Sequence, residues 1–299
     1  MQRQDWSGVF PAITTPFHDD LSTDYAALET QVQWLIEHGC RGIVALGSLG
    51  EAATLTSEEK IEILKHVKHA LKGKSPIVAG ISALSTAEAV SLAKEAYKAG
   101  VDGLMVLPPY VYRGDWRETE SHLSAIFHAT PLSSMLYNNP IAYGTDITPQ
   151  QILELRARHD NFHAVKESSG EIRRITEIRL LAKDSLSILV GMDDVVVEGV
   201  AAGATGWIAG LVNALPIESV RLFELARHGQ SKELEELYAW FLPLLRLDTV
   251  PKFVQLIKFV QEEAGVGSAR VRPPRLQLTD VERNNLVTLI RKSLANRTQ

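Results

Sequence analysis

Several features are scarce in this chain, and each scarcity narrows the range of functions. Cys40 is the single cysteine among 299 residues, so an intramolecular disulfide is impossible and a reducing compartment fits. Basic residues are not in excess, because the formal net charge is −5 with both signs interspersed. No apolar run reaches the length of a membrane span, and residues 1–5 lack the apolar core of a signal peptide. We therefore expect a cytoplasmic protein with neither a membrane nor a nucleic-acid partner.

Clusters of metal ligands are also lacking where a catalytic site would need them. A metal-dependent enzyme gathers histidine or carboxylate ligands at one place. Here the histidines fall mostly on predicted helices, and His163 opens a predicted strand at the end opposite to the site discussed below. We therefore expect neither a metal nor a separate cofactor.

Short apolar runs alternate with amphipathic helical patterns over the first 228 residues. Most of the runs show no in/out alternation, which is typical of strands buried on both faces. Eight strand–helix units predict a (β/α)₈ TIM barrel. The competing fold is a doubly wound open sheet, but the glycine-rich fingerprint usual after its first strand is missing from residues 12–17. The apolar runs are residues 8–15, 42–46, 76–80, 103–107, 134–137, 162–165, 187–190 and 205–209.

Strand patterns stop after residue 228. Residues 231–247, 250–264 and 279–295 have the pattern of three additional C-terminal helices, and the paired prolines Pro273 and Pro274 indicate an extended connection before the last one. No glycine- or serine-rich linker separates these helices from the barrel. We therefore predict a barrel with the active site in residues 1–228, and a helical extension in residues 229–299 that packs on it.

Lys166 is the most informative residue of the chain. It follows the apolar run 162–165, so its amine stands at the end of a buried strand. Desolvation lowers the pKa of a lysine and makes it a nucleophile toward carbonyl carbons. Lowering the pKa from 10.4 to near 7 requires about 4–5 kcal/mol of destabilisation of the charged form, which only a closed apolar pocket supplies. The alternative is a lysine that extends its amine to solvent from a strand end.

Other reactive groups are predicted at the same end of the barrel, where active sites of this fold lie. Tyr137 ends the fifth predicted strand, and Tyr110 follows Pro108 and Pro109 after the fourth. The turn of residues 47–50, after the second, can bind a carboxylate through its backbone N–H groups. Alone, these features indicate a core tyrosine, a loop and an ordinary turn. Together with Lys166 they favour an enzyme that forms a Schiff base with a small 2-oxo acid or its cyclic imine.

At these residues the chain resembles the dihydrodipicolinate synthase / N-acetylneuraminate lyase superfamily. The resemblance covers essentially the whole chain. It implies a (β/α)₈ barrel with C-terminal helices, a homotetramer built as a dimer of dimers, and class I aldolase-type lyase chemistry without metal or nucleotide. The motifs that carry it are Gly47-Ser48-Leu49-Gly50-Glu51, Tyr137-Asn138-Asn139-Pro140 and Lys166-Glu167-Ser168-Ser169.

The resemblance also implies a role for each matched residue. Lys166 would form the imine, and Tyr137 would act as general acid and base. Ser48, Tyr137 and Tyr110 would form a proton relay, with Tyr110 acting in its own or a neighbouring subunit. Ser48 and the backbone of Leu49 would bind the substrate carboxylate. The remaining substrate contacts are Gly47, Thr14, Gly191 and Ile208, with Asn139, Ser168, Ser169 and Tyr143 toward the distal half of the substrate.

Two departures from the best-known members bear on the substrate. Dihydrodipicolinate synthases carry the motif Gly-Thr-Thr-Gly-Glu after the second strand, and this chain has Ser48 and Leu49 in place of the two threonines. They also carry an arginine for the carboxylate of the second substrate, at the position of Ala142, whose methyl group cannot make that contact. Sialic-acid lyases keep a hydroxyl that Leu49 lacks.

The chain looks most similar to members assigned to hydroxyproline breakdown, the 1-pyrroline-4-hydroxy-2-carboxylate deaminases, which form 2,5-dioxopentanoate. Residues 137–144, 252–255 and 271–276 carry this similarity. The alternatives are a dihydrodipicolinate synthase and a 2-keto-3-deoxy sugar acid aldolase or dehydratase. A non-catalytic 2-oxo acid sensor on the same barrel is the alternative from outside enzymology.

Overall fold

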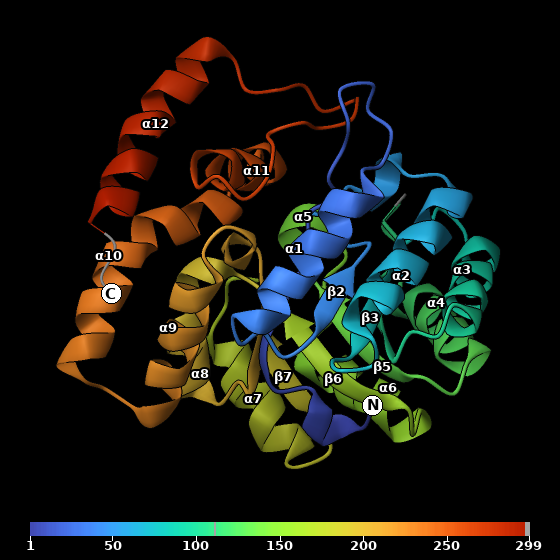
Figure 1. Ribbon diagram of the computed structural model, residues 1–299. Coiled ribbons are helices and arrows are strands. Elements are labelled where there is room, and N and C mark those ends of the chain that lie inside the picture. The colour runs from blue at the N-terminus through green and yellow to red at the C-terminus, as the bar shows by residue number, and fades with distance from the viewer. Residues whose placement is uncertain (111, 297–299) are drawn as a thin grey trace.

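The computed structural model describes residues 1–110 and 112–296. Within them, eight strands lie side by side in the order β1-β8-β7-β6-β5-β4-β3-β2, and all pairs are parallel. A parallel bridge between Ala12 and Val44 joins β1 to β2 and closes the sheet. The predicted (β/α)₈ barrel is confirmed (Figure 1). The strands are β1 (Gly8–Pro11), β2 (Ile43–Ala45), β3 (Ile77–Ile81), β4 (Gly103–Val106), β5 (Ser133–Asn138), β6 (Phe162–Glu167), β7 (Ser187–Val190) and β8 (Gly206–Ala209).

Helices surround the strands, and several start at the capping residues that the sequence indicates. The Thr56 hydroxyl accepts the amide of Glu59, and the Glu59 carboxylate accepts the amide of Thr56. Thr148 caps a helix that has Pro149 at its first position, as predicted. The helices around the barrel are α1 (Tyr25–Glu37), α2 (Ser57–Leu71), α3 (Thr86–Lys98), α4 (Trp116–Ala129), α5 (Pro140–Tyr143), α6 (Pro149–Arg158), α7 (Arg173–Ala182), α8 (Val196–Ala202) and α9 (Pro216–His228).

Short 3₁₀ helices stand beside these elements, and three of them border the site. They are η3 (Asp193–Val195), η4 (Leu211–Asn213) and η5 (Arg246–Asp248), with η1 (Arg3–Asp5) and η2 (Ala52–Thr54) elsewhere. Because η3 follows β7 and η4 follows β8, both lie at the carboxyl ends of the strands.

Apolar side chains fill the barrel as well as its outer face. The interior group ends in Tyr137 toward the carboxyl ends of the strands, so the barrel is a packed core with a polar mouth. The larger cluster lies between the strands and the helices. The interior group is Trp6, Phe10, Ala12, Val44, Val78, Met105, Leu107, Met135, Tyr137, Ala164, Leu189 and Ile208.

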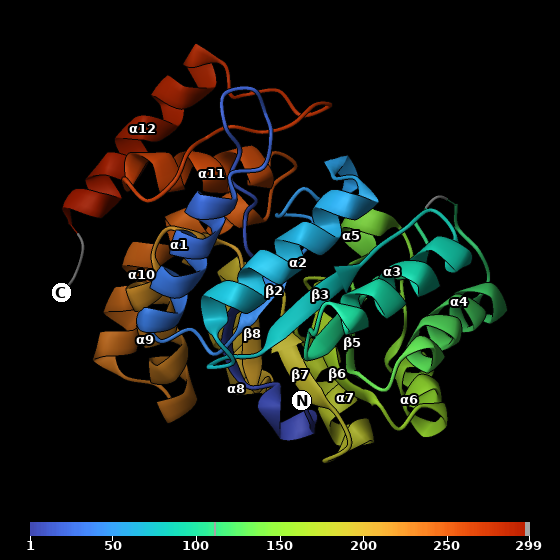
Figure 2. The same cartoon turned by 45° about the vertical axis from the view of Figure 1, so that its right-hand side comes forward.

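Three C-terminal helices gather on one side of the barrel, beside α1 and α9, in both views (Figures 1 and 2). They are α10 (Lys232–Leu245), α11 (Phe253–Glu263) and α12 (Asp280–Ala295). α10 packs on α9, and α11 packs on η4. The three predicted helices are confirmed. The division of the chain at residue 228 stays a prediction, and residues 297–299 lie outside the described residues.

Two strand ends differ from the expected ones by more than one residue. β1 ends at Pro11, although the apolar run continues to residue 15, because the chain leaves the sheet after the Ala12 bridge. β6 extends through Lys166 to Glu167, beyond the end of its apolar run. Lys166 therefore belongs to the strand itself, and its side chain follows the alternation that places Ala164 inside the barrel.

Candidate active site

Lys166 lies at the barrel mouth between Tyr137 of β5 and Leu189 of β7. Its side chain is buried, with a residue exposure of 6%. The amine stands 3.9 Å from the centroid of the Tyr137 ring. Gly191 makes room for it, since a Cβ at that position would lie 2.8 Å from Lys166 Cε. The amine therefore does not extend to solvent, and Gly191 lies beside the lysine, while its predicted contact with the substrate stays a prediction.

The electrostatics of Lys166 suit a nucleophile. Desolvation lowers its pKa to about 8, although the negative charges of Asp248 and Asp193 act in the opposite direction. No hydrogen bond or ion pair to the Lys166 amine occurs within the described residues. A substantial fraction of the amine is consequently neutral near pH 8, with its lone pair free for an electrophilic carbon.

Tyr137 is held beside this amine by Asn139. Burial raises the pKa of Tyr137 to about 12, so the phenol keeps its proton at neutral pH. The amide of Asn139 donates a 2.9 Å hydrogen bond to the phenol oxygen. Its carbonyl accepts the amide of Ala142 at 3.0 Å and so starts α5. Asn139 therefore orients the phenol, and its predicted contact with the substrate stays a prediction.

Tyr143 lies next to all three residues of the predicted proton relay. Its hydroxyl is hydrogen-bonded to that of Ser48, and its ring centroid lies 5.8 Å from that of Tyr137 and 5.9 Å from that of Tyr110. The predicted relay of Ser48, Tyr137 and Tyr110 omits this residue. The sequence analysis placed Tyr143 only near the distal half of the substrate, because the single turn α5 that carries it has no periodic pattern. A contribution of Tyr110 to a neighbouring subunit stays a prediction.

The turn after β2 presents unpaired amides. Leu46 (φ 63°) and Glu51 (φ 56°) flank it in the left-handed region, which non-glycine residues seldom adopt. The N–H groups of Ser48 and Leu49 donate to no acceptor in the described part of the chain. They are free for a carboxylate, as predicted. The Leu49 side chain packs into the outer core, so only its backbone is available. A Cβ added to Gly47 would lie 3.6 Å from Met105 Cε.

Ser168 and Ile208 complete the surroundings of the lysine. The Ser168 hydroxyl would lie 1.9 Å from a Cβ on Gly191, so it stands beside Lys166. It is completely buried near the Tyr137 phenol, yet it has no partner with hydrogen-bond geometry among the described residues. A buried hydroxyl without a partner is uncommon and indicates a site that a ligand completes. Ile208 lines the barrel interior, and its exposure is 1%.

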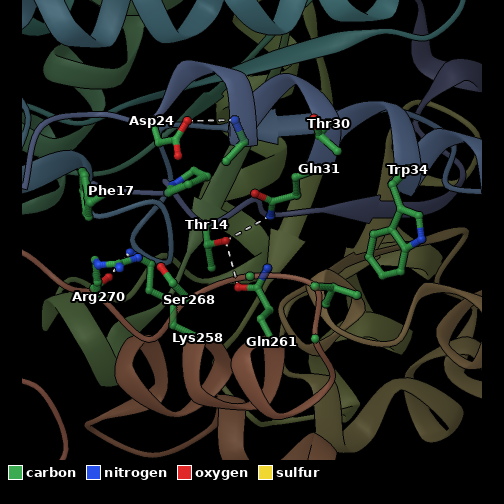
Figure 3. Close-up of a pocket in the computed structure, with 15 residues that line it drawn as sticks. Thr14, Phe17, Asp24, Thr30, Gln31, Trp34, Lys258, Gln261, Ser268 and Arg270 are labelled. Atoms are coloured by element: carbon green, nitrogen blue, oxygen red, sulfur yellow. Dashed lines mark hydrogen bonds between the residues drawn. The ribbon is translucent and has the colours of Figure 1, made fainter. Parts of the chain in front are cut away.

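Thr14 lines a pocket other than the surroundings of Lys166, and its predicted contact with the substrate stays a prediction. Its hydroxyl donates to Gln261 at 2.9 Å and accepts from Gln31 at 3.0 Å. Figure 3 shows these bonds in a pocket of about 460 Å³ between α1 and the end of α11. The chain leaves β1 before Thr14, so strand alternation no longer directs this side chain toward the barrel axis.

Two acidic residues that the sequence analysis did not assign to the site lie close to Lys166. Asp193 accepts hydrogen bonds from Trp207 Nε1 at 2.9 Å and from the amides of Gly210 and Leu211 at 3.1 and 2.8 Å. Burial nevertheless raises its pKa to about 6. Asp248 comes from η5, in the C-terminal extension. Asp193 follows a predicted strand end, which is a usable signal, whereas nothing local marks Asp248.

Other kinds of site find less support in the described residues. They include no group of three or more His, Cys, Asp or Glu side chains arranged to hold a metal ion. No described helix combines the length and the apolar character needed to cross a bilayer.

Comparisons with known proteins agree with this geometry. A model of the dihydrodipicolinate synthetase family matches residues 5–293. The chain belongs to this family. It is therefore a lyase of the dihydrodipicolinate synthetase type. A 4-hydroxy-tetrahydrodipicolinate synthase of Caldicellulosiruptor saccharolyticus is 32% identical over 280 residues, which cover 93% of this chain and 92% of that one. The synthase of Haloarcula marismortui is 32% identical, over 94% and 92% of the two chains.

Solved structures of the family have the same fold. The 4-hydroxy-tetrahydrodipicolinate synthase of Methylacidiphilum fumariolicum SolV is 31% identical, with a TM-score of 0.89 and 97% of each chain covered. The dihydrodipicolinate synthase of Acinetobacter baumannii in complex with pyruvate is 27% identical, with a TM-score of 0.91 over 96% of this chain and 99% of that one. A monomeric variant of the synthase also matches, at 25% identity and a TM-score of 0.90, so family membership alone does not specify a tetramer.

Proposed function

We propose that this member of the dihydrodipicolinate synthetase family forms a Schiff base through Lys166, and that it converts 1-pyrroline-4-hydroxy-2-carboxylate to 2,5-dioxopentanoate and ammonia. The observation that carries the Schiff-base step is the buried Lys166 amine, 3.9 Å from the Tyr137 ring centroid, whose pKa is lowered to about 8. The free amides of Ser48 and Leu49 supply a place for the carboxylate next to the reacting carbon.

The reaction divides into steps that these groups can perform. Lys166 attacks C2 of the cyclic imine, and the ring nitrogen departs as an amine with a proton that Tyr137 supplies. Loss of a proton from C3 gives the eneamine, which expels the 4-hydroxyl as water. The resulting unsaturated amine isomerises and hydrolyses to an aldehyde and ammonia, and hydrolysis of the imine frees Lys166. In sum, one substrate and one water give one 2,5-dioxopentanoate and one ammonia.

Ala142 supports this substrate over the second substrate of a synthase. It lies exposed on α5, and its methyl group offers no charge for a carboxylate. One observation favours synthase activity instead: two relatives that are 32% identical over most of the chain are 4-hydroxy-tetrahydrodipicolinate synthases. Both reactions share the imine at Lys166, so they differ in the distal half of the site.

Turnover by the purified protein tests the proposal. We expect release of ammonia and 2,5-dioxopentanoate from 1-pyrroline-4-hydroxy-2-carboxylate, and little product from pyruvate with the second substrate of the synthase. Borohydride with pyruvate should attach a covalent adduct to the peptide that contains Lys166, and Lys166→Ala should form none. An adduct on Lys166→Ala would refute the mechanism. Turnover of 2-keto-3-deoxy sugar acids alone would change the substrate, and binding of the whole panel without turnover would indicate a sensor.

A further inference from the structure

Asp248 belongs to the C-terminal extension, yet its carboxyl group reaches the barrel mouth. It ends η5, between α10 and α11. A Cβ placed on Gly210 would lie 2.1 Å from Asp248 Oδ1, so the carboxyl group lies directly over the carboxyl end of β8. Any other residue at position 210 would collide with this group. The absence of a side chain there is therefore what admits Asp248 to the mouth.

The position of Asp248 relative to the lysine follows from the strand order. Tyr137 lies on β5 and Lys166 on β6, whereas Gly191 and Gly210 follow β7 and β8. Asp248 consequently approaches the Lys166 amine from the β8 side, opposite to Tyr137. It acts on both groups, since its charge raises the pKa of Lys166 and that of Tyr137.

Asp248 differs from Asp193 in its hydrogen bonding. Asp193 accepts bonds from an indole and two amides, which fix its carboxylate in place. The Asp248 carboxyl makes no hydrogen bond or ion pair with any residue that the structure describes. Desolvation, and then repulsion from Asp193, raise the pKa of Asp248 well above its usual range, against the attraction of Lys166. A general acid needs a carboxyl group that is free to donate its proton to the substrate. Asp248 meets this requirement, because it is partly buried beside Lys166 and has no hydrogen-bond partner among the described residues.

A second observation places a ligand in the same space. Ser168 is completely buried beside Lys166, with a hydroxyl that has no partner of hydrogen-bond geometry among the described residues. The Ser168 hydroxyl, just after β6, and the Asp248 carboxyl, on η5, thus both lack a hydrogen-bond partner near one lysine among the described residues. A substrate attached to Lys166 satisfies them together.

We propose that Asp248 is a catalytic residue of this site, the general acid that protonates the hydroxyl group leaving the distal part of the Lys166-bound substrate. This inference rests on the proposed function. As the eneamine forms the C3–C4 double bond, the C4–O bond breaks, and the carboxyl proton of Asp248 leaves with the oxygen as water. One proton is lost from C3 and one is delivered to the oxygen, so the step is a dehydration without a change of oxidation state.

Asp248→Asn keeps the shape of the side chain and removes the transferable proton. With 1-pyrroline-4-hydroxy-2-carboxylate we expect kcat to fall by about 10²–10⁴-fold, the usual contribution of a general acid. With the 4-fluoro analogue the loss should shrink to less than about tenfold, because fluoride leaves with less help from a proton. Borohydride trapping of pyruvate at Lys166 should persist, since Asp248 takes no part in imine formation.

Two further variants guard against a purely structural effect. Gly210→Ala displaces the Asp248 carboxyl without changing its chemistry, so it should show the same selective loss on the hydroxyl substrate. Asp184→Asn alters an exposed carboxyl between α7 and β7 that is absent from the charges acting on Lys166 and on Asp248, and it should change kcat by less than about twofold.

Each remaining outcome counts against the inference. An unchanged kcat for Asp248→Asn on the hydroxyl substrate overturns it, and so does an equal loss on the hydroxyl and fluoro substrates. Loss of pyruvate trapping together with turnover would make Asp248 a positioning residue for Lys166. If the unmodified protein neither traps pyruvate nor consumes the pyrroline, the proposed function itself has failed, which is a distinguishable result.

Discussion

Two buried lysines, Lys166 and Lys258, have almost the same pKa but differ in their hydrogen-bond partners. Their exposures are 6% and 2%, and desolvation lowers the pKa of each to about 8. The Lys258 amine donates three hydrogen bonds, to Glu51 Oε1 at 2.6 Å and to the carbonyls of Thr15 at 2.8 Å and Arg270 at 2.6 Å. Both amines lie over an aromatic ring, Lys258 over Phe17 and Lys166 over Tyr137, but Lys166 makes no hydrogen bond within the described residues. A lowered pKa therefore reports burial in both lysines, and the missing hydrogen-bond partners distinguish Lys166, the proposed nucleophile.

The bonds of Lys258 have a structural result of their own. Glu51 also accepts the backbone amide of Arg272 at 3.0 Å, and the Arg272 guanidinium pairs with Glu59 at 2.6 Å. This network joins the C-terminal extension to the turn that carries Ser48. The extension thus contributes twice to the site, once by holding that turn and once by bringing Asp248 to the mouth.

The largest difference should appear when Lys166 loses its amine. Lys166→Met should reduce turnover by about 10⁴-fold or more, because no neighbouring group replaces the nucleophile. The free energy of unfolding should stay the same or rise, since the change removes a desolvated amine that has no hydrogen bond. Steady-state kinetics and chemical denaturation of the same preparation measure both. A large loss of stability would show that Lys166 has a structural role like that of Lys258.

The matched change at Lys258 should reverse this pattern. Lys258→Met leaves Glu51, whose exposure is 0%, without its counter-charge and should lower the free energy of unfolding by about 3–5 kcal/mol. The protein that remains folded should still trap pyruvate at Lys166. The double variant Glu51→Gln with Lys258→Met should recover part of the loss. If the single variant is as stable as the parent, the ion pair does not hold the extension.

The smallest and most discriminating effect is on the pH dependence of imine formation. The neutral amine reacts, so the rate of pyruvate trapping with cyanoborohydride should rise with pH and level off above about pH 8, where Lys166 has lost its proton. Asp193, Asp248 and Tyr137 are the titratable groups that face the amine. Because the Asp248 charge raises the pKa of Lys166, Asp248→Asn should move this rise to lower pH.

Lys258 serves as the internal control for that measurement. Its pKa is similar, so a probe that responded to pKa alone would label both lysines. Peptide mapping should find the adduct at Lys166 only. Labelling of Lys258 to a similar extent, or a rise with pH that does not shift in Asp248→Asn, would contradict the electrostatic account.

Local patterns were sufficient for the barrel, for Lys166 and for Tyr137. Each strand has an apolar run that only a doubly buried strand tolerates, and a lysine next to such a run stands out. The same patterns did not indicate the hydrogen bond between Tyr143 and Ser48 or the bonds of Thr14 to Gln31 and Gln261, because both residues sit where periodic structure stops. They gave no indication of Asp248, which is far from the barrel strands in sequence and only one acidic residue among 36 Asp and Glu.

The sequence by itself determined the alternation of strands and helices, the family motifs and the presence of a lysine at the end of a buried strand, because these depend on neighbouring residues and on burial that an apolar run implies. Only the tertiary structure decided which of two desolvated lysines keeps a free lone pair and which carboxyl faces it. Both depend on hydrogen-bond partners brought from distant segments, Glu51 to Lys258 and Asp248 to the end of β8. Burial is a local consequence of composition, whereas the pairing of buried polar groups is settled only when the chain has closed upon itself.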